Sequence, residues 1–278
     1  MIGGIELGGT KCLVAVANNP LEIVEKKLIT TKDPISTISE IKSFFTNFQI
    51  ARLGVGSFGP LVLNSGSKDY GLLVAESKNG WKGINIVKEF SKISTNIVLD
   101  TDVNAAALGE YKYGAGKSSE TFVYVTIGTG IGVGILIGGK PNVGNFHLEI
   151  GHMFVPNNDN FKGVCRIHGN CWEGLASGPA IHTRWGVQAG DLSPDHEAWE
   201  KEAQLLAFGI INIISNHSPD KIVLGGGVMS QKHLFEMIRL HVKRMWNGYT
   251  PLGSLPDLIL EPELGKDSGI VGSLYLAL

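Results

Sequence analysis

The feature that most constrains this chain is a short pattern that occurs twice. Two apolar runs joined by a glycine turn occupy residues 2–17, and the same arrangement returns at residues 122–137. The turns are Gly8-Gly9-Thr10-Lys11 and Gly128-Thr129-Gly130. Apolar runs on both sides of a glycine turn predict a β-hairpin. Internal repetition is stronger evidence for a fold than a single motif, so we expect two halves of similar plan.

Strand and helix signals follow each hairpin. After the first we expect strands at residues 23–30, 52–57 and 97–99, helices at 36–48 and 103–113, and an irregular stretch at 61–95. The helix at 36–48 has a candidate capping box from Thr37 to Glu40. After the second hairpin we expect a strand at 221–224 and helices at 196–216, 230–246 and 268–278. The fold class is therefore α/β, with a first domain at residues 1–116 plus 265–278 and a second domain at 117–264.

Both hairpin turns have the composition of an anion-binding loop. The first offers backbone amides without Cβ atoms, a hydroxyl and a cation, from Gly8, Gly9, Thr10 and Lys11. The second offers the same without the cation, from Gly128, Thr129, Gly130 and Gly132. Consecutive amides in a tight turn form a concave anion site, and glycine lets a phosphate come close. One such turn alone is more often plain turn chemistry, but two matching turns predict a polyphosphate held between them.

Two better-known phosphate signatures fail when their spacing is checked. Gly116-Lys117-Ser118 imitates the end of a P-loop, but Tyr111 stands where the first glycine is required. Gly225-Gly226-Gly227 follows a strand and precedes a helix, but the third glycine of a dinucleotide fingerprint would fall at Ser230. A helix start at the end of a strand still suits a nucleotide. We therefore interpret Gly225, Gly226 and Gly227 as an adenosine contact.

A cluster of possible metal ligands lies between the second hairpin and the helix at 196–216. His152, Cys165, His168 and Cys171 have the spacing H-x12-C-x2-H-x2-C. Zinc takes four nitrogen or sulfur ligands in a tetrahedron, and short gaps between Cys and His suit it. The alternative is a chance cluster with free thiols. Four protein ligands leave no open position for chemistry, so we predict a structural zinc site.

Composition excludes several classes of protein. A hydrophobic share of 43% with 18% charged residues is typical of a folded chain, and a net charge of -2 argues against nucleic acid or an acidic membrane as partner. The uncharged stretch at 122–139 reaches the length of a membrane span, but its repeated glycines favour two strands and a turn. Three cysteines are too few for a disulfide framework, and no secretory signal opens the chain. We therefore expect a cytoplasmic protein.

Together these motifs resemble a known family. Glu6 to Lys11, Gly128 to Gly132 and Leu224 to Gly227 resemble the two phosphate motifs and the adenosine motif of the actin-like ATPase fold. The chain is similar to the bacterial ROK sugar kinases from residue 2 to its C-terminus. The resemblance implies a two-domain, ribonuclease H-like fold with a cleft between the domains, and ATP with Mg²⁺ as cofactors. ROK repressors carry an N-terminal helix-turn-helix, whereas here the first strand follows Met1, so we expect no nucleic-acid partner.

The resemblance also implies a catalytic base. Thr101-Asp102-Val103-Asn104 resembles the family's Asn-Asp-x-Asn stretch, with Thr101 in place of the usual Asn. Asp102 is thereby implied to take the proton from the sugar and to contact it. Its position between a strand and a helix is equally typical of a helix N-cap. Glu6 replaces the aspartate common in the first motif of the fold, and we expect it to act on Mg²⁺ through water.

Further resemblance concerns the sugar. Glu149-Ile150-Gly151-His152 resembles the family's Glu-x-Gly-His motif, which implies that Glu149 and His152 touch sugar hydroxyls, and Glu173 corresponds to another sugar ligand. Taken alone, both glutamates read as solvated loop residues. Asn79, in Asn79-Gly80-Trp81, is a candidate hydroxyl partner, and this loop and Ser57-Phe58-Gly59-Pro60 resemble pocket loops of the fructokinase branch.

The substrate prediction depends on this branch. The family's zinc motif usually has a third cysteine where this chain has His168, a variation that resembles the fructokinase branch. We therefore expect ATP-dependent phosphorylation of a hexose, with D-fructose to fructose 6-phosphate as the leading reaction. A glucose, mannose or N-acetylmannosamine kinase stays open, as does a non-catalytic sugar sensor, against which Asp102 argues. Family members are often dimers, so the expected partners are a sugar, ATP and a second copy of the chain, without a membrane.

Overall fold

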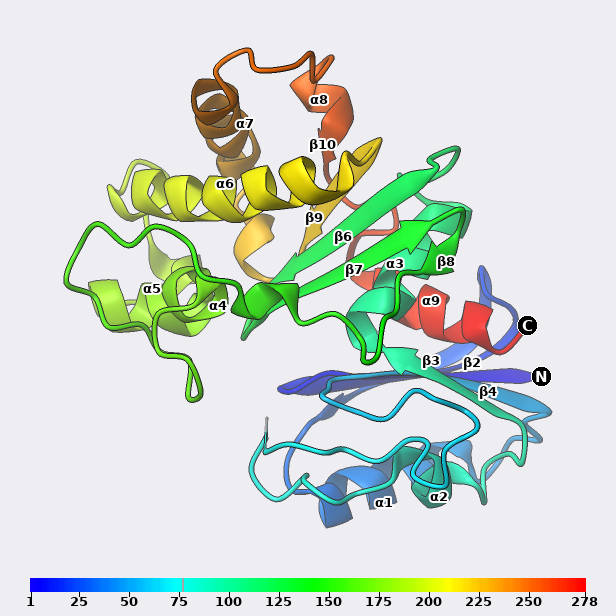
Figure 1. The fold of residues 1–278 in the computed structure, drawn as a ribbon. Helices are drawn as coiled ribbons and strands as arrows, with labels where there is room; N and C mark the ends of the chain where they lie inside the picture. The colour runs from blue at the N-terminus through cyan, green and yellow to red at the C-terminus, as the bar shows by residue number, and fades with distance from the viewer. Residues whose placement is uncertain (77) are drawn as a thin grey trace. The chain divides into compact units, whose positions relative to one another are not determined.

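The computed structural model describes residues 1–76 and 78–278 and resolves the chain into two compact units. The first unit comprises Met1–Gly114, Pro141–Leu148 and Asp267–Leu278, and the second comprises Ala115–Lys140 and Glu149–Lys266. Each unit has its own five-stranded sheet (Figure 1). The sequence assigns residues 141–148 to the second domain, but in the structure this segment packs with the first unit.

The sheet of the first unit has the strand order β3-β2-β1-β4-β5. Its strands are β1 (Ile2–Leu7), β2 (Lys11–Asn19), β3 (Glu22–Thr30), β4 (Arg52–Ser57) and β5 (Ile97–Thr101). β1, β2 and β3 pair antiparallel, while β1 with β4 and β4 with β5 pair parallel. The predicted first hairpin is confirmed. Because β1, β4 and β5 run in one direction, their carboxyl ends meet at one edge of the sheet.

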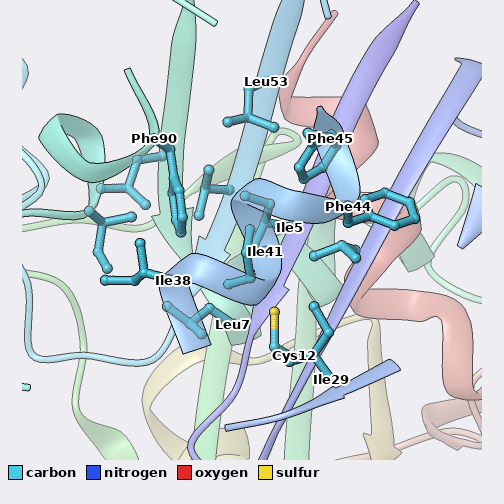
Figure 2. Packing of buried hydrophobic residues seen from close by; sticks show 14 of the residues in the cluster. Ile5, Leu7, Cys12, Ile29, Ile38, Ile41, Phe44, Phe45, Leu53 and Phe90 are labelled. Atoms are coloured by element: carbon cyan, nitrogen blue, oxygen red, sulfur yellow. The ribbon is translucent and has the colours of Figure 1, made fainter. Parts of the chain in front are cut away.

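One face of this sheet is covered by α1 (Pro34–Phe45) and the short α2 (Ile86–Phe90). α1 begins earlier than predicted, because Pro34 occupies its first turn and the Asp33 side chain accepts a hydrogen bond from the Ser36 amide. The capping box predicted at Thr37 is therefore wrong. Figure 2 shows the apolar core that results between α1 and the sheet. Its buried members include Ile5, Leu7, Ile38, Ile41, Phe44, Phe45, Leu53 and Phe90.

The opposite face of the same sheet carries α3 (Asp102–Tyr113) and α9 (Ser268–Leu276) (Figure 1). The two helices touch backbone to backbone, since a Cβ at Gly272 would stand 1.6 Å from the carbonyl oxygen of Ala105. Only glycine permits that approach. The buried Ser268 hydroxyl also donates to the Glu110 carboxylate at 2.7 Å. These contacts fix the helix on which Asp102 stands.

The sheet of the second unit has the order β10-β9-β6-β7-β8. Its strands are β6 (Thr121–Ile127), β7 (Ile131–Ile137), β8 (Lys140–Pro141), β9 (Lys221–Gly225) and β10 (Ile259–Leu260). β6 and β7 form an antiparallel hairpin, as predicted, and β9 runs parallel to β6. The first unit has the same central plan, a hairpin whose first strand pairs in parallel with a later strand.

The helices of the second unit are α4 (Trp172–Ala176), α5 (Gly178–Trp185), α6 (Ala198–His217), α7 (His233–Trp246) and α8 (Leu255–Leu258). α4 packs on α6, where the buried Trp172 indole donates from Nε1 to the Leu205 carbonyl oxygen at 3.0 Å. This contact anchors the first turn of α4, which carries Glu173. Within residues 1–76 and 78–278, the structure contains no helix with the length and apolar character needed to span a bilayer.

Candidate active site and metal centre

Two acidic side chains stand at the carboxyl edge of the first unit's sheet. Glu6 lies near the end of β1, and Asp102 follows β5 directly. Through the parallel register, Glu6 is paired with Gly56 of β4, and Gly56 with Asp100 of β5. Ligands of open α/β sheets bind outside the carboxyl ends of parallel strands. The edge that holds Glu6 and Asp102 is therefore the candidate active site of this unit.

Asp102 is the first residue of α3 and is not its N-cap. The Thr101 side chain fills that position by accepting a hydrogen bond from the Asn104 amide at 3.1 Å. The substitution of Thr for the family's Asn thus puts a capping hydroxyl at this position. Asp102 Oδ1 accepts from the Val103 amide at 2.8 Å. Because the helix is capped by its neighbour, the Asp102 carboxylate is not needed to hold the helix start.

Burial controls the charge of both acids. Burial raises the pKa of Asp102 to about 6, although the hydrogen bond from the Val103 amide opposes the shift. Burial also raises the pKa of Glu6 to about 7; the charge of Asp102 adds to the increase and the cation of Lys11 reduces it. The cation of Lys11 offsets only part of the repulsion between the Glu6 and Asp102 carboxylates, so the pair still favours a further positive charge. A divalent cation fits this set, since hard cations take carboxylate oxygens.

The predicted first phosphate loop, Gly8 to Lys11, connects β1 to β2. The Gly8 amide donates to the Lys11 carbonyl oxygen at 3.0 Å, and the Thr31 hydroxyl donates to the Gly8 carbonyl oxygen at 2.8 Å. Gly9, Thr10 and Lys11 are exposed. Lys78 also reaches this loop, with its Nζ donating to the Gly9 carbonyl oxygen at 2.7 Å. A lysine in an irregular stretch gives no signal of this contact in the sequence. Asn79, the next residue, lies in an exposed turn.

The predicted second phosphate loop, Gly128 to Gly130, connects β6 to β7, and backbone and side-chain hydrogen bonds hold it in place. The Gly128 amide donates to the Gly130 carbonyl oxygen at 2.9 Å, and the Gly178 amide at the start of α5 donates to the Gly128 carbonyl oxygen at 2.8 Å. The Ile131 amide donates to Glu173 Oε2 at 3.0 Å. Gly132, also predicted for this loop, lies in β7.

The predicted adenosine motif, Gly225 to Gly227, lies beside this second loop. A Cβ at Gly128 would stand 3.8 Å from the Gly227 amide nitrogen. Gly226 has a φ of +93°, and a Cβ there would stand 2.3 Å from the Ile127 carbonyl oxygen. The backbone turn after β9 therefore requires glycine to fit against the end of β6. Two motifs that are distant in sequence thus form one glycine-lined surface in the second unit.

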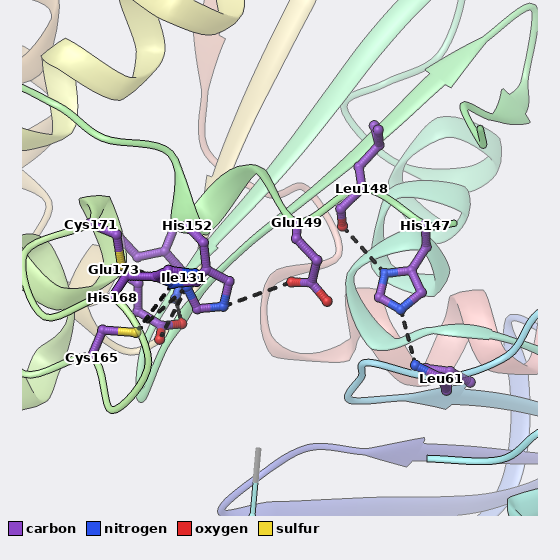
Figure 3. Close-up of polar contacts among 10 residues, drawn as sticks. All are labelled: Leu61, Ile131, His147, Leu148, Glu149, His152, Cys165, His168, Cys171 and Glu173. Carbon is purple, nitrogen blue, oxygen red and sulfur yellow. Dashed lines mark hydrogen bonds and ion pairs between the residues drawn. The ribbon is translucent and has the colours of Figure 1, made fainter. Parts of the chain in front are cut away.

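The four predicted metal ligands converge in the second unit (Figure 3). His152 Nδ1 lies 3.7 Å from Cys165 Sγ and 3.6 Å from Cys171 Sγ, and His168 Nδ1 lies 3.8 Å from Cys165 Sγ. All four ligand atoms lie within 4.8 Å of one another. A tetrahedron with Zn–N of about 2.0 Å and Zn–S of about 2.3 Å has N···S edges of about 3.6 Å. The donor set and its spacing fit zinc.

The same histidine connects the metal centre to the predicted sugar ligands. With Nδ1 facing the cysteines, Nε2 of His152 points to Glu149, 3.9 Å from Oε2 (Figure 3). Glu173 Oε1 lies 4.0 Å from Nδ1. Glu149, His152 and Glu173 therefore gather in one place within the second unit. The ring can bind a metal through one nitrogen and offer the other to a hydroxyl group.

The comparisons with known proteins agree with this arrangement. The sequence profile of the ROK family matches residues 2–278. The chain is 41% identical to a protein of Bacillus subtilis (strain 168), over 100% of this chain and 95% of that protein. It is 36% identical to the fructokinase of Pediococcus pentosaceus, over 100% of this chain and 97% of that protein. The chain therefore belongs to the ROK family.

A solved structure gives the same answer for the fold. The ROK family glucokinase from Streptomyces griseus, crystallised with glucose and AMPPNP, superposes with a TM-score of 0.78 at 21% sequence identity. The match covers 99% of this chain and 98% of that chain. The family and the actin-like fold predicted from the glycine motifs are both confirmed.

Proposed function

We propose that the chain is an ATP-dependent fructokinase that converts D-fructose to fructose 6-phosphate. The observation that carries this proposal is the full-length identity of 36% to an enzyme named fructokinase. The Cys-His-Cys variation at Cys165, His168 and Cys171, which resembles the fructokinase branch, supports fructose over glucose. The acidic edge of the first unit and the two glycine loops supply the groups that phosphoryl transfer needs.

Asp102 is the proposed general base. The 6-hydroxyl of fructose attacks the γ-phosphorus of ATP, the hydroxyl proton passes to the Asp102 carboxylate, and ADP leaves with the electrons of the broken P–O bond. A base works best when its pKa lies near the working pH, and burial raises the pKa of Asp102 to about 6. The carboxylate is then ionised at neutral pH and still has a useful affinity for the proton.

The glycine loops are the proposed phosphate sites. The backbone amides of the exposed residues Gly9 and Thr10 and the cation of Lys11 would bind phosphate oxygens from the first unit. The amides of Gly128 to Gly130 would bind them from the second, and Gly225 to Gly227 would contact the adenosine. Glu6 would hold Mg²⁺ through water. Mg²⁺, when bound, neutralises charge on the transferring phosphate.

The metal centre has a proposed structural role. Zinc bound by His152, Cys165, His168 and Cys171 would fix the loop between Glu149 and Glu173, so that both carboxylates are held ready for the sugar hydroxyls. Four protein ligands leave no position for substrate. Zinc then affects the reaction only through the position of these side chains. Asn79 is the proposed hydroxyl contact from the first unit.

A coupled assay of ADP release with fructose, glucose, mannose and N-acetylmannosamine tests the proposal. The expected result is that fructose has the highest kcat/KM. If ADP is released with another hexose and not with fructose, that hexose replaces fructose as the proposed substrate. If calorimetry shows that a sugar binds, but no ADP is released in the presence of any of the four sugars, a non-catalytic sensor is favoured. The expected homodimer stays a prediction, which light scattering after gel filtration tests.

A further inference from the structure

His147 is a buried histidine that the sequence motifs do not include. It lies on the segment Pro141–Leu148, which packs with the first unit, and its side chain is 8% exposed. The Leu61 amide donates to His147 Nε2 at 3.1 Å, and His147 Nδ1 lies 3.4 Å from the Leu148 carbonyl oxygen (Figure 3). Nε2 needs a free lone pair to accept, so these partners assign the neutral ring with its proton on Nδ1.

The surroundings of the ring favour this neutral form. Burial lowers the pKa of His147 from its ordinary value. A Cβ at Gly59 would stand 2.9 Å from Cε1 of the imidazole, so the ring fits only against a glycine at this position. The Phe146 ring lies on the imidazole with a centroid distance of 4.4 Å. The histidine is therefore packed tightly against the loop that runs from Phe58 to Leu61.

This loop and this segment both lead to predicted sugar contacts. Ser57 to Pro60 is the stretch that resembles a pocket loop of the fructokinase branch. Leu148 is the last residue of its segment in the first unit, and Glu149, a predicted sugar ligand, is the next residue along the chain. The hydrogen bond from Leu61 to His147 thus ties the pocket loop to the segment that ends at Leu148.

We propose that His147 is a positioning residue for the sugar: it holds the Phe58–Leu61 loop against the segment Pro141–Leu148, which leads along the chain to Glu149. The inference rests on the proposed function, since it assigns these loops to the sugar pocket. It concerns the sugar and not the nucleotide, because the loop that His147 contacts, through the Leu61 amide and Gly59, is the predicted sugar-pocket loop.

Two substitutions separate the hydrogen bond from the volume of the ring. In His147→Gln the amide oxygen takes a place close to that of Nε2 and accepts from Leu61. In His147→Leu the space is filled but the Leu61 amide has no acceptor. We expect His147→Leu to raise the KM for fructose about ten-fold, the effect of one lost buried hydrogen bond, with the KM for ATP unchanged. His147→Gln restores most of the affinity for fructose.

Two measurements test the inference: the KM values for fructose and ATP, and the amide hydrogen exchange of Leu61, which does not depend on activity. An unchanged KM for fructose in His147→Leu overturns the inference, as does a parallel rise in both KM values or a failure of His147→Gln to restore the affinity. A wild-type protein that releases no ADP with fructose would instead overturn the proposed function. In that case amide exchange of Leu61 still decides: faster exchange in His147→Leu than in His147→Gln supports the link, and equal rates refute it.

Discussion

The carboxylate of Glu173 accepts a hydrogen bond from the backbone amide of Ile131, with 3.0 Å between Oε2 and the nitrogen. Ile131 is the first residue of β7, directly after the second phosphate loop. The other carboxylate oxygen lies 4.0 Å from Nδ1 of the metal-site residue His152. One side chain therefore joins the predicted phosphate loop to the predicted metal centre, and a change at Glu173 should affect both substrates.

Replacing Glu173 with alanine tests this connection. A hydrogen bond to a charged acceptor is worth about 1.5–3 kcal/mol, so we expect Glu173→Ala to raise the KM for ATP about ten-fold in addition to the KM for fructose. Glu149→Ala is the matched control, because it removes the other predicted sugar carboxylate and should raise the KM for fructose alone. Steady-state kinetics in each substrate measure both values. Unchanged ATP affinity in Glu173→Ala would mean that the loop holds its shape without this side chain.

The pH dependence of the reaction should report Asp102. The base must be ionised to accept a proton, and burial raises the pKa of Asp102 to about 6. We therefore expect kcat/KM to fall as the pH drops below about 6, since this parameter follows the free enzyme. A pH series with a constant Mg²⁺ concentration measures it. If kcat/KM instead falls only near pH 4, the general base is a carboxylate whose pKa is not raised by burial.

The same shift predicts that Asp102 weakens the fold at neutral pH. Its pKa rises from 3.8 to about 6 on folding, so the folded protein binds the proton more tightly than the unfolded chain. The stabilising contribution of this group is complete below about pH 4 and is lost as the pH rises through 6. Asp102→Asn should therefore stabilise the protein by on the order of 2 kcal/mol at pH 7.5, with a smaller difference at pH 4.5. Urea unfolding at the two pH values checks this, and a variant less stable at pH 7.5 would contradict it.

Removal of the metal should loosen the sugar pocket. We expect about one zinc per chain by elemental analysis, and loss of that zinc in Cys165→Ser and Cys171→Ser, because both thiolates are in the ligand set. Cys12→Ala is the control, since Cys12 is buried in the core of the first unit and should not alter the zinc content. Chelation should lower the melting temperature and raise the KM for fructose. Full activity and unchanged melting in zinc-free protein, with Mg²⁺ restored, would contradict the structural role.

Much of the fold could be read from the sequence because its signals are local. The two hairpins and the helix after Asp102 follow from apolar runs and glycine turns within a few residues. The sequence also predicts the cluster of Cys and His side chains that the structure brings together, since these residues fall within one short window. The short helices α2 and α4 were missed, because five residues give too little periodicity to recognise.

What the sequence could not provide are contacts between residues far apart along the chain. Lys78 reaches the Gly9 carbonyl across 69 positions, and Glu173 reaches the Ile131 amide across 42. The sequence places residues 141–148 with the second domain, whereas the structure groups them with the first unit, where His147 bonds to Leu61, 86 positions away. Such pairings depend on how the sheets and loops pack, which spacing does not encode.

Phosphorus NMR of fructose incubated with ATP and Mg²⁺ tests the central claim most directly. We expect wild-type protein to form fructose 6-phosphate and ADP in equal amounts, and Asp102→Asn to form them about 10²–10⁴ times more slowly, the usual worth of a general base. Asp100→Asn is the control, because Asp100 accepts hydrogen bonds from Thr101 and Asn104 and is assigned no part in the transfer. No sugar phosphate from the wild type, or equal rates in wild type and Asp102→Asn, would contradict the account.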